Sequence, residues 1–231
     1  EFKPVEYPYR YPDKNSVLYH LIEVQDYDMI LKYTDDEFIK SWVEFQKGNY
    51  ATSMIIARDA MDKIKVKPPK TDLRWRLVYP QNYYKQVQNY AAQYNNNDAL
   101  MMAIIREESS FNSDAQSGVG AIGLMQLMPS TAHDIGQKHG IIFNTSYLFN
   151  PELNIRLGNL YYSTIKGMLN NMDVSAIAAY NGGIGSVTRW KSTFLYNDTD
   201  EFVEQIPYDE TKNYVEKVFR SYWNYTRIYQ K

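Results

Sequence analysis

The sequence predicts a mainly α-helical fold, and two observations lead to that prediction. Apolar residues recur at helical spacing through most of the chain, as in the run that contains Met101, Ile104 and Ile105. No stretch alternates apolar and polar residues for long enough to build a large sheet. Any β-structure should therefore be minor, and we expect it within residues 110–125.

The first 77 residues are expected to form a short helical segment. An extended arm is expected over residues 1–14, because three prolines stand there among aromatic and charged residues. Helices should follow, with a break near Asp26, a cap at Asp35 or Asp36 and a separation at Gly48. The expected helices cover residues 16–33, 37–47 and 50–66.

The last two of these helices should form a hairpin that is loosely similar to a helical-repeat unit, on the strength of Trp42, Gly48, Tyr50 and Ala57. A solenoid of such repeats buries its core between neighbouring units, so one hairpin alone would be a shortened solenoid. A proline pair at residues 68–69 marks a linker to the next region.

Residues 78–231 are expected to form a second helical region. Asn97 or Asp98 is the expected N-cap of its second helix, which ends in Glu107 and Glu108. The helices expected in this region cover residues 81–94, 97–109, 130–138, 151–169, 175–180, 185–191 and 208–229.

Composition excludes several classes of function. The net charge of −2 gives no support for nucleic-acid binding. The chain has no cysteine, which excludes disulfides, thiolate zinc sites and a cysteine nucleophile. The three histidines, His20, His133 and His139, have no metal-ligand spacing and form no serine–histidine pattern, so we expect neither a metal nor a cofactor.

No run of residues approaches the length of an apolar membrane span, so no transmembrane segment is expected. The chain begins at Glu1 rather than at methionine, and no signal peptide is visible in it. We therefore expect that a leader was removed, that the chain is a fragment, or both.

Glu107 and Glu108 are the candidate acids. Adjacent helical residues point about 100° apart, so the two carboxylates should face different surroundings. Glu108 continues the apolar stripe of Ile104 and Ile105, and desolvation there should raise its pKa. A carboxylic acid that is neutral near neutral pH can protonate a leaving group. Periodicity alone does not decide between the two, and both could be solvated residues at a helix end.

Residues 118–123 have the form G-x-G-x-x-G. This pattern indicates dinucleotide binding only when it follows a strand and opens a helix within a βαβ unit. A glutamate-rich helix end precedes it here, so we reject nucleotide binding. The glycines more plausibly allow the backbone to pass close to a sugar ring or to the helix before them.

Glu108-Ser109 and the segment Ser117–Pro129, which reads SGVGAIGLMQLMP, resemble the catalytic domain of soluble lytic transglycosylases, relatives of goose-type lysozyme that cleave peptidoglycan. The resemblance covers residues 78–230 in order. Its further motifs are Asn150-Pro151 with Asn154-Ile155 and Gly158, Ala179-Tyr180-Asn181-Gly182-Gly183, and Glu204-Gln205-Ile206-Pro207-Tyr208 with Glu210-Thr211.

The resemblance implies a lysozyme-like α+β domain with minor β-structure over residues 78–231, behind the helical segment 1–77. It also implies cleavage of the MurNAc-β-1,4-GlcNAc bond of peptidoglycan glycan strands in the periplasm. Glu108, as the glutamate followed directly by serine, would be the single general acid and base, and the product would carry a 1,6-anhydroMurNAc end. The expected substrate-binding residues are Ser109, Ser117, Gln126, Met128, Tyr180, Asn181 and Glu204, with the Tyr180 hydroxyl near the catalytic carboxyl.

Three positions depart from the family pattern: Gly118 replaces a common proline, Gly183 a usual alanine, and Lys212 a frequent arginine. These departures put loop rigidity and one salt bridge in doubt, but they remove no reacting group. Two other functions stay open. A lysozyme-type muramidase would use Glu108 and admit water, whereas a non-catalytic helical scaffold would need none of the downstream motifs.

Overall fold

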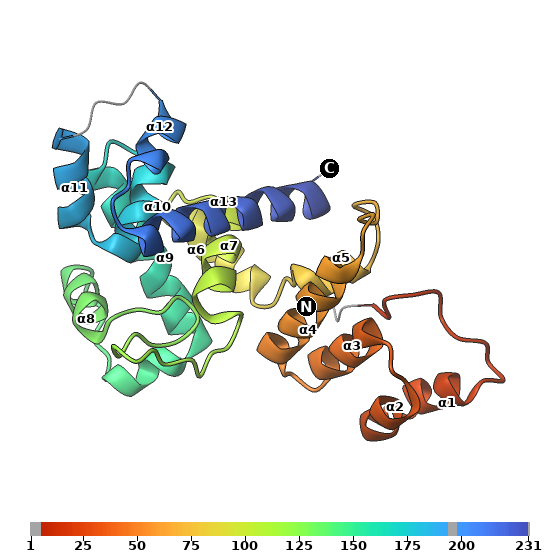
Figure 1. Cartoon of the computed structure of the whole chain (residues 1–231). Coiled ribbons are helices and arrows are strands. Elements are labelled where there is room, and N and C mark those ends of the chain that lie inside the picture. Colours follow the sequence, from red (N-terminus) through yellow and green to blue (C-terminus); the bar gives the residue numbers. More distant parts are fainter. Residues whose placement is uncertain (1–5, 194–197, 231) are drawn as a thin grey trace. The chain divides into compact units, whose positions relative to one another are not determined.

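The computed structural model describes residues 6–193 and 198–230 (Figure 1). Regular structure in these residues is helical, apart from two isolated β-bridges. The prediction of a mainly helical fold is therefore confirmed. No helix in the described ranges is both long enough and apolar enough to cross a bilayer.

The chain divides into two compact units. The first contains residues 1–82 with the short segments 110–112 and 226–231, and the second contains residues 83–109 and 113–225. Because short segments from later in the chain belong to the first unit, no single position in the sequence separates the two units. The expected boundary after residue 77 stays a prediction.

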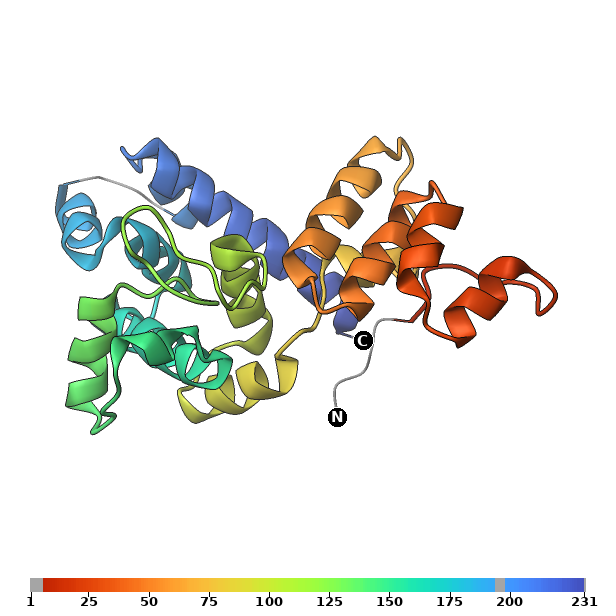
Figure 2. The same cartoon turned by 90° about the horizontal axis from the view of Figure 1, so that it is seen from below.

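The first unit is built around a helix hairpin. Helices α3 and α4 lie side by side in both views (Figures 1 and 2), and α5 packs against both. The helices of this unit are α1 (Val17–Glu23), α2 (Tyr27–Tyr33), α3 (Glu37–Gln46), α4 (Tyr50–Lys63) and α5 (Arg74–Val78).

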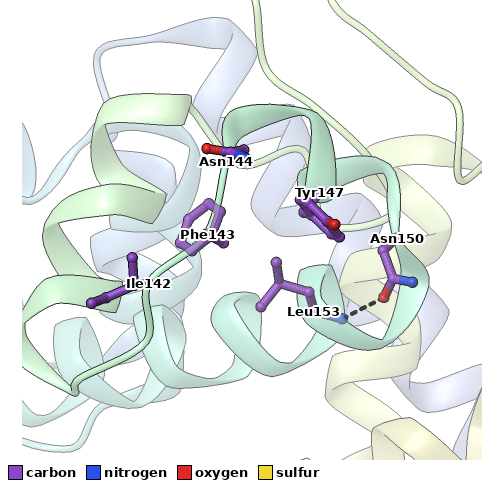
Figure 3. Close-up of a pocket in the computed structure, with 6 residues that line it drawn as sticks. All are labelled: Ile142, Phe143, Asn144, Tyr147, Asn150 and Leu153. Carbon is purple, nitrogen blue, oxygen red and sulfur yellow. Dashed lines mark hydrogen bonds between the residues drawn. The ribbon is translucent and has the colours of Figure 1, made fainter.

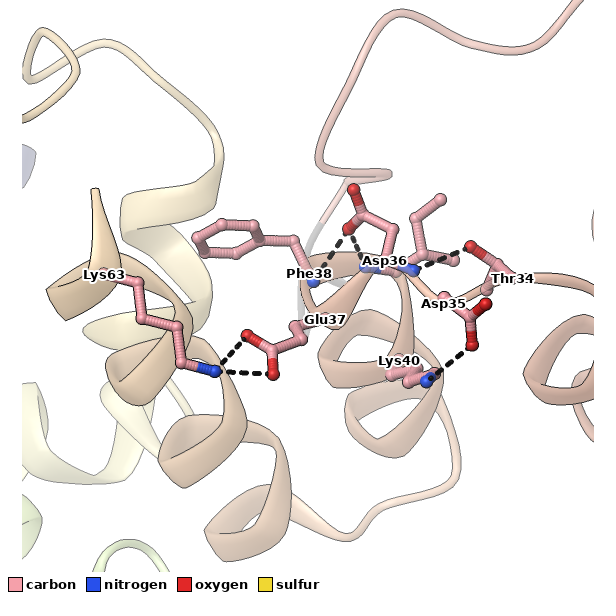
Figure 4. Close-up of polar contacts among 8 residues, drawn as sticks. Thr34, Asp35, Asp36, Glu37, Phe38, Lys40 and Lys63 are labelled. Atoms are coloured by element: carbon pink, nitrogen blue, oxygen red, sulfur yellow. Dashed lines mark hydrogen bonds and ion pairs between the residues drawn. The ribbon is translucent and has the colours of Figure 1, made fainter. Parts of the chain in front are cut away.

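The helix breaks of this unit follow from its capping residues. The predicted break near Asp26 is confirmed, because the Asp26 side chain accepts the N–H of Met29 and caps α2. Asp36 caps α3, with Oδ1 accepting the N–H of Phe38 at 2.8 Å and that of Ile39 at 3.0 Å (Figure 4). One carboxylate thus satisfies two of the backbone donors that a helix start leaves unpaired.

The arm before α1 packs on the hairpin. The Tyr9 hydroxyl donates to Oδ2 of Asp36 at 2.8 Å, so the α3 cap also holds the arm. The Tyr7 ring meets Trp42 edge to face with 5.4 Å between centroids, and the Arg74 guanidinium lies 5.7 Å from the Tyr9 centroid. These contacts bury the Tyr7 ring, of which 7% is exposed. Residues 1–5 of the expected arm lie outside the described residues.

An ion pair joins the two helices of the hairpin at its surface. Lys63 Nζ lies 2.8 Å from Oε1 of Glu37, and Figure 4 shows it spanning from α4 to α3. Both side chains are exposed, so the pair adds little stability. Inside the hairpin, the Ser41 hydroxyl donates to the backbone carbonyl of Ser53 at 2.8 Å. This buried bond satisfies a hydroxyl that the packed core would otherwise leave without a partner.

In the second unit, α9 is the central helix and packs against α6, α8, η1 and α10. The elements of this unit are α6 (Tyr84–Gln93), α7 (Asp98–Ser109), α8 (Pro129–Lys138), the 3₁₀ helix η1 (Thr145–Phe149), α9 (Pro151–Met168), α10 (Asp173–Gly182), α11 (Ile184–Thr193), α12 (Thr199–Glu204) and all but the last turn of α13 (Asp209–Tyr229).

Helix α7 presents the two candidate acids. The Asn97 side chain accepts the N–H of Leu100 at 3.0 Å, as expected of an N-cap. All residues from Ala99 to Arg106 are buried, so the helix is enclosed for two turns before it reaches Glu107 and Glu108. The packing around these two turns sets where the last turn and both carboxyl groups lie.

The loop between α7 and α8 contains the small amount of β-structure. Ile122 pairs with Gln116 and with Leu127 in isolated bridges, which agrees with the predicted minor β-structure. Gly123 has a φ of +78°, and a Cβ there would lie 2.4 Å from Asn154 Nδ2. A glycine is therefore required at this turn, because the loop backbone runs directly against α9. The element that precedes this loop is the helix α7.

Several elements differ from the sequence-based expectation. Helices α5 and α12 and the 3₁₀ helix η1 were not predicted, and α4 ends at Lys63 rather than near residue 66. The unpredicted helices have five or six residues, which is too short to show a helical period. Tertiary packing rather than local pattern stabilises helices of this length.

Candidate active site

Glu107 is held in a buried ion pair. Its Oε1 accepts hydrogen bonds from Nη1 of Arg106 and from the Ser221 hydroxyl of α13. Nη1 of Arg106 also donates to Ser221 Oγ at 3.1 Å, which closes a three-membered network. The network therefore ties the end of α7 to α13 and holds the Glu107 carboxyl group in place.

Glu108 lies in different surroundings. Its Oε1 accepts a hydrogen bond of 2.6 Å from the Tyr214 hydroxyl of α13. Burial raises the pKa of Glu108 from 4.5 to about 7, the Tyr214 bond opposes this rise, and the negative charge of Glu107 adds to it. Desolvation disfavours the ionised form, and this effect is the largest of the three. Glu108 can therefore hold or release a proton near neutral pH.

Tyr214 remains a hydrogen-bond donor at every physiological pH. Burial and the nearby charge of Glu108 raise the pKa of Tyr214 well above its ordinary value. Its ring is buried on the inner face of α13, together with Thr211, Val215, Val218 and Ser221. The hydroxyl is thus fixed by packing and points at one carboxylate oxygen.

Tyr180 lies in the same electrostatic environment but has another partner. Burial, and then the charge of Glu108, raise the pKa of Tyr180 well above its usual range. Its hydroxyl donates to the backbone carbonyl of Met125 at 2.9 Å, which ties α10 to the loop between α7 and α8. The hydrogen bond to the Glu108 carboxylate comes from Tyr214.

Ser117 and Gln126 hold the loop in shape. Ser117 Oγ accepts the N–H of Ala121 at 2.9 Å. Gln126, at a φ of +45°, donates from Nε2 to the carbonyls of Gly123 at 2.9 Å and Ala115 at 3.2 Å. Both side chains therefore form hydrogen bonds within the loop. Their contact with a substrate stays a prediction.

Asn154 anchors this loop to α9. Its Oδ1 accepts the N–H of Met125 at 2.8 Å, and its Nδ2 donates to the carbonyls of Ile122 and Leu148 at 2.9 and 2.8 Å. The side chain is fully buried, and both the carbonyl oxygen and the NH₂ group of its amide form hydrogen bonds. The motif around Asn150 and Asn154 in the sequence thus has a structural role, since it fixes the loop that follows Glu108.

The remaining predicted site residues lie at the edges of this arrangement. The Ser109 hydroxyl donates to the carbonyl of Ile105 at 3.2 Å, within its own helix. Met128 begins α8 with 39% of its surface exposed. Asn181 is exposed at the end of α10, where its Oδ1 accepts a 2.7 Å hydrogen bond from the Thr211 hydroxyl.

Glu204 forms an ion pair with Lys212. Its side chain is 72% exposed, so solvent screens the pair. Lysine thus forms a salt bridge at the position where the resemblance makes arginine frequent. The role of Glu204 in substrate binding stays a prediction.

Sequence reasoning missed Tyr214, Ser221 and Asn154 as parts of the site. Each places a polar group on a buried helix face, where it needs a partner. For Tyr214 and Ser221 the signal was present, because they stand seven residues apart on the apolar face of a predicted helix. The sequence could not show which carboxylate each would meet. Within residues 6–193 and 198–230, no three His, Asp or Glu side chains gather as a metal site would require.

The chain was compared with known families and proteins. The family described as Transglycosylase SLT domain matches residues 85–203. The soluble lytic murein transglycosylase of Escherichia coli is 39% identical over 129 residues, which are 54% of this chain and 20% of that protein. The membrane-bound lytic murein transglycosylase C of Histophilus somni is 35% identical over 153 residues, covering 62% of this chain and 40% of that protein. The chain thus spans less than half the length of these relatives.

Among solved structures, an inactive glutamate-to-glutamine mutant of the lytic transglycosylase Slt from Pseudomonas aeruginosa superimposes with a TM-score of 0.74 and 28% identity. The match covers 92% of this chain and 36% of that one. The family match covers more than half of this chain and includes Glu108, the loop after it and Tyr180. The chain therefore belongs to the family of soluble lytic transglycosylases.

Proposed function

We propose that this protein is a peptidoglycan lytic transglycosylase that cleaves the MurNAc-β-1,4-GlcNAc bond, with Glu108 as its single general acid and base. The observation that carries the proposal is the Glu108 carboxyl, which accepts a 2.6 Å hydrogen bond from the Tyr214 hydroxyl and whose pKa burial raises to about 7. A general acid works best when its pKa lies near the operating pH. The names of the relatives indicate murein, the peptidoglycan of the cell wall, as the substrate. We propose that the protein acts on it in the periplasm.

In the first step, protonated Glu108 donates its proton to the glycosidic oxygen, and the C1–O bond of the MurNAc residue breaks. Tyr214 then stabilises the carboxylate that forms, because a hydrogen bond to a charged acceptor is stronger than one to a neutral acceptor. In many glycosidases a second carboxylate serves as nucleophile or base. Among the described residues, Glu107 is the other carboxylate that affects the pKa of Glu108, and its own oxygen is engaged by Arg106.

The 2-acetamido group of the substrate takes the part of that second carboxylate in this proposal. The 6-hydroxyl of MurNAc then attacks C1 and gives its proton to ionised Glu108, which forms the 1,6-anhydro ring and restores the acid. A tethered nucleophile has a high effective concentration, so it reacts faster than water that no residue activates. Ser109, Ser117, Gln126, Met128, Tyr180, Asn181 and Glu204 are proposed to bind the glycan around this centre.

Mass spectrometry of digested sacculi tests the proposal. Purified peptidoglycan is incubated with the chain and with its Glu108→Gln variant, and the released muropeptides are weighed before and after borohydride treatment. We expect products that are lighter by one water than lysozyme products and that resist reduction. Reducible products would instead assign a muramidase, and no release above that of the Glu108→Gln variant would reject the enzyme.

A further inference from the structure

A hollow on the second unit lies between the end of α8 and the start of α9. Its volume is about 530 Å³, within the range of small-molecule sites. Figure 3 shows Phe143 and Tyr147 on either side of Leu153 in this view, with Ile142 beyond Phe143. The lining residues are Ile142, Phe143, Asn144, Tyr147, Asn150 and Leu153. None of the residues proposed for catalysis or glycan binding above lines it.

One wall of the hollow is rigid. The Phe143 ring stacks on His133, with 4.5 Å between centroids and 3° between planes. His133 is held in turn by Thr145, since Nε2 and Oγ1 lie 3.1 Å apart. On α8, a Cβ at Gly136 would lie 3.0 Å from the Phe143 ring, so the ring lies directly against the helix backbone. A wall that is fixed before binding loses little freedom when a ligand arrives.

The lining has no charged side chain. It offers the half-buried Phe143 ring, the Tyr147 ring with 58% of its surface exposed, and Ile142 with 98% exposed. Two amides supply polar groups. Asn150 Oδ1 accepts the N–H of Leu153 at 3.1 Å, and Figure 3 shows its amide nitrogen directed away from that bond.

The second amide belongs to Asn144, which precedes η1 but makes no capping hydrogen bond with its side chain. Its carbonyl oxygen and NH₂ group can therefore both serve a ligand. Flat apolar faces combined with neutral donors and acceptors suit a pyranose ring, which has C–H groups on its faces and hydroxyls at its rim. The acetamido group of an N-acetylhexosamine adds a neutral donor, a neutral acceptor and a methyl group.

We propose that this hollow is a second saccharide-binding site, which holds an uncharged N-acetylhexosamine unit of a glycan strand away from Glu108. The ligand class rests on the proposed function, whereas binding itself requires no turnover. An uncharged lining disfavours the peptide stems of peptidoglycan, which carry carboxylates, because a charged group desolvated there would find no partner. A site of this kind would keep the chain on a glycan strand between cleavage events.

Residue-resolved NMR titration with chitotetraose, a soluble tetramer of N-acetylglucosamine, tests this site. The whole Glu108→Gln chain is used, so that nothing is cleaved during the titration. We expect amide shifts across residues 142–150 with a saturation curve of their own. Tyr147→Ala should weaken that binding about tenfold, and Asn144→Ala about threefold to tenfold, since each removes one contact with the sugar.

Tyr33→Ala is the matched control, because Tyr33 is 56% exposed in the first unit and lines no part of the hollow. A thermal melt of each variant checks that it is folded. Shifts confined to residues near Glu108, or equal affinity at residues 142–150 for Tyr147→Ala and Tyr33→Ala, would overturn the second site. Its failure is separate from that of the proposed function, because chitotetraose binding and the mass of digestion products are measured independently.

Discussion

Two adjacent carboxylates at the end of α7 have opposite surroundings. Glu107 faces Arg106 and Ser221, which both donate to it, and the group is locked in an ion pair. Glu108 faces Tyr214, and burial raises the pKa of its carboxyl to about 7. The helix turn of about 100° between neighbours is enough to separate a structural carboxyl group from a proton donor. The two residues are both glutamates and are neighbours in the sequence, so their surroundings decide their different roles.

The largest expected effect separates the two carboxylates by activity. Glu108→Gln should lower the rate of peptidoglycan cleavage about 10²- to 10⁴-fold, because the amide keeps the shape but donates no acidic proton. Glu107→Gln should retain most of the rate. Turbidity loss of purified sacculi measures both. If Glu107→Gln is the inactive variant, the roles proposed for the two residues must be exchanged.

A second comparison concerns stability at one pH. Glu107→Gln should lower the free energy of unfolding by about 3 kcal/mol, since Arg106 loses its counterion while it remains buried. Chemical denaturation at pH 6 measures this loss. Lys63→Gln provides the control, because it breaks the exposed ion pair with Glu37 and should cost no more than about 1 kcal/mol. Equal losses would mean that Glu107 is not held as described.

The third prediction concerns how the free energy of unfolding changes with pH because of Glu108. Its pKa is about 7 in the folded state and about 4.5 when unfolded, so the folded state retains the proton to higher pH. The free energy of unfolding should therefore fall by up to about 3 kcal/mol as pH rises from 4.5 to 7, at 1.36 kcal/mol per unit of pKa shift. Glu108→Gln removes this fall. Parallel stability curves for wild type and Glu108→Gln over this range would refute the shift.

Tyr214→Phe should move the pKa of Glu108 further upward. The hydroxyl stabilises the ionised carboxyl, and a hydrogen bond to a charged group is worth about 1.5–3 kcal/mol. Its loss should shift the Glu108 limb of the pH–rate profile upward by about one to two units and slow turnover at pH 7 about ten- to a hundredfold. A profile that does not move would return Tyr214 to a packing role.

Of these substitutions, Tyr180→Phe should change the rate and the pH–rate profile least. The family resemblance predicted a loss of about ten- to a hundredfold in rate, on the expectation that this hydroxyl is positioned for the carboxyl or for the reacting sugar. Because the hydroxyl donates to the Met125 carbonyl, we expect a smaller loss, of about tenfold or less. The pH–rate profile should keep its Glu108 limb. A shift as large as that of Tyr214→Phe would show that Tyr180 bonds Glu108 in the working enzyme.

The helices were predictable where sequence period and capping residues agreed. Asp36 caps α3 as expected, a helix break falls at Asp26 as expected, and the buried run before Glu107 is an enclosed helix. The short helices α5 and α12 were missed, because five or six residues show no period. The long helices could thus be predicted from local sequence, whereas the short helices depend on tertiary contacts.

The candidate site was predictable only in part. Periodicity suggested that Glu108 faces inward, but it could not reveal that Arg106 and Ser221 would donate hydrogen bonds to Glu107. The contacts of Ser221 with Arg106 and with Glu107 join residues more than a hundred positions apart in the chain. The hydrogen bond from the Tyr214 hydroxyl to Glu108 also spans more than a hundred positions, so the sequence did not show it. A side chain's partner is a property of the packed fold, and sequence spacing along one helix does not specify it.

A carbon-13 NMR titration of glutamate side-chain carboxyls would measure the difference between the two residues without any substrate. The resonances of Glu107 and Glu108 are assigned by their disappearance in Glu107→Gln and Glu108→Gln. Glu108 should titrate with a pKa of about 7, because burial outweighs its bond to Tyr214. A pKa near 4.5 for Glu108 would contradict its role as the proton donor and would leave the site without its acid.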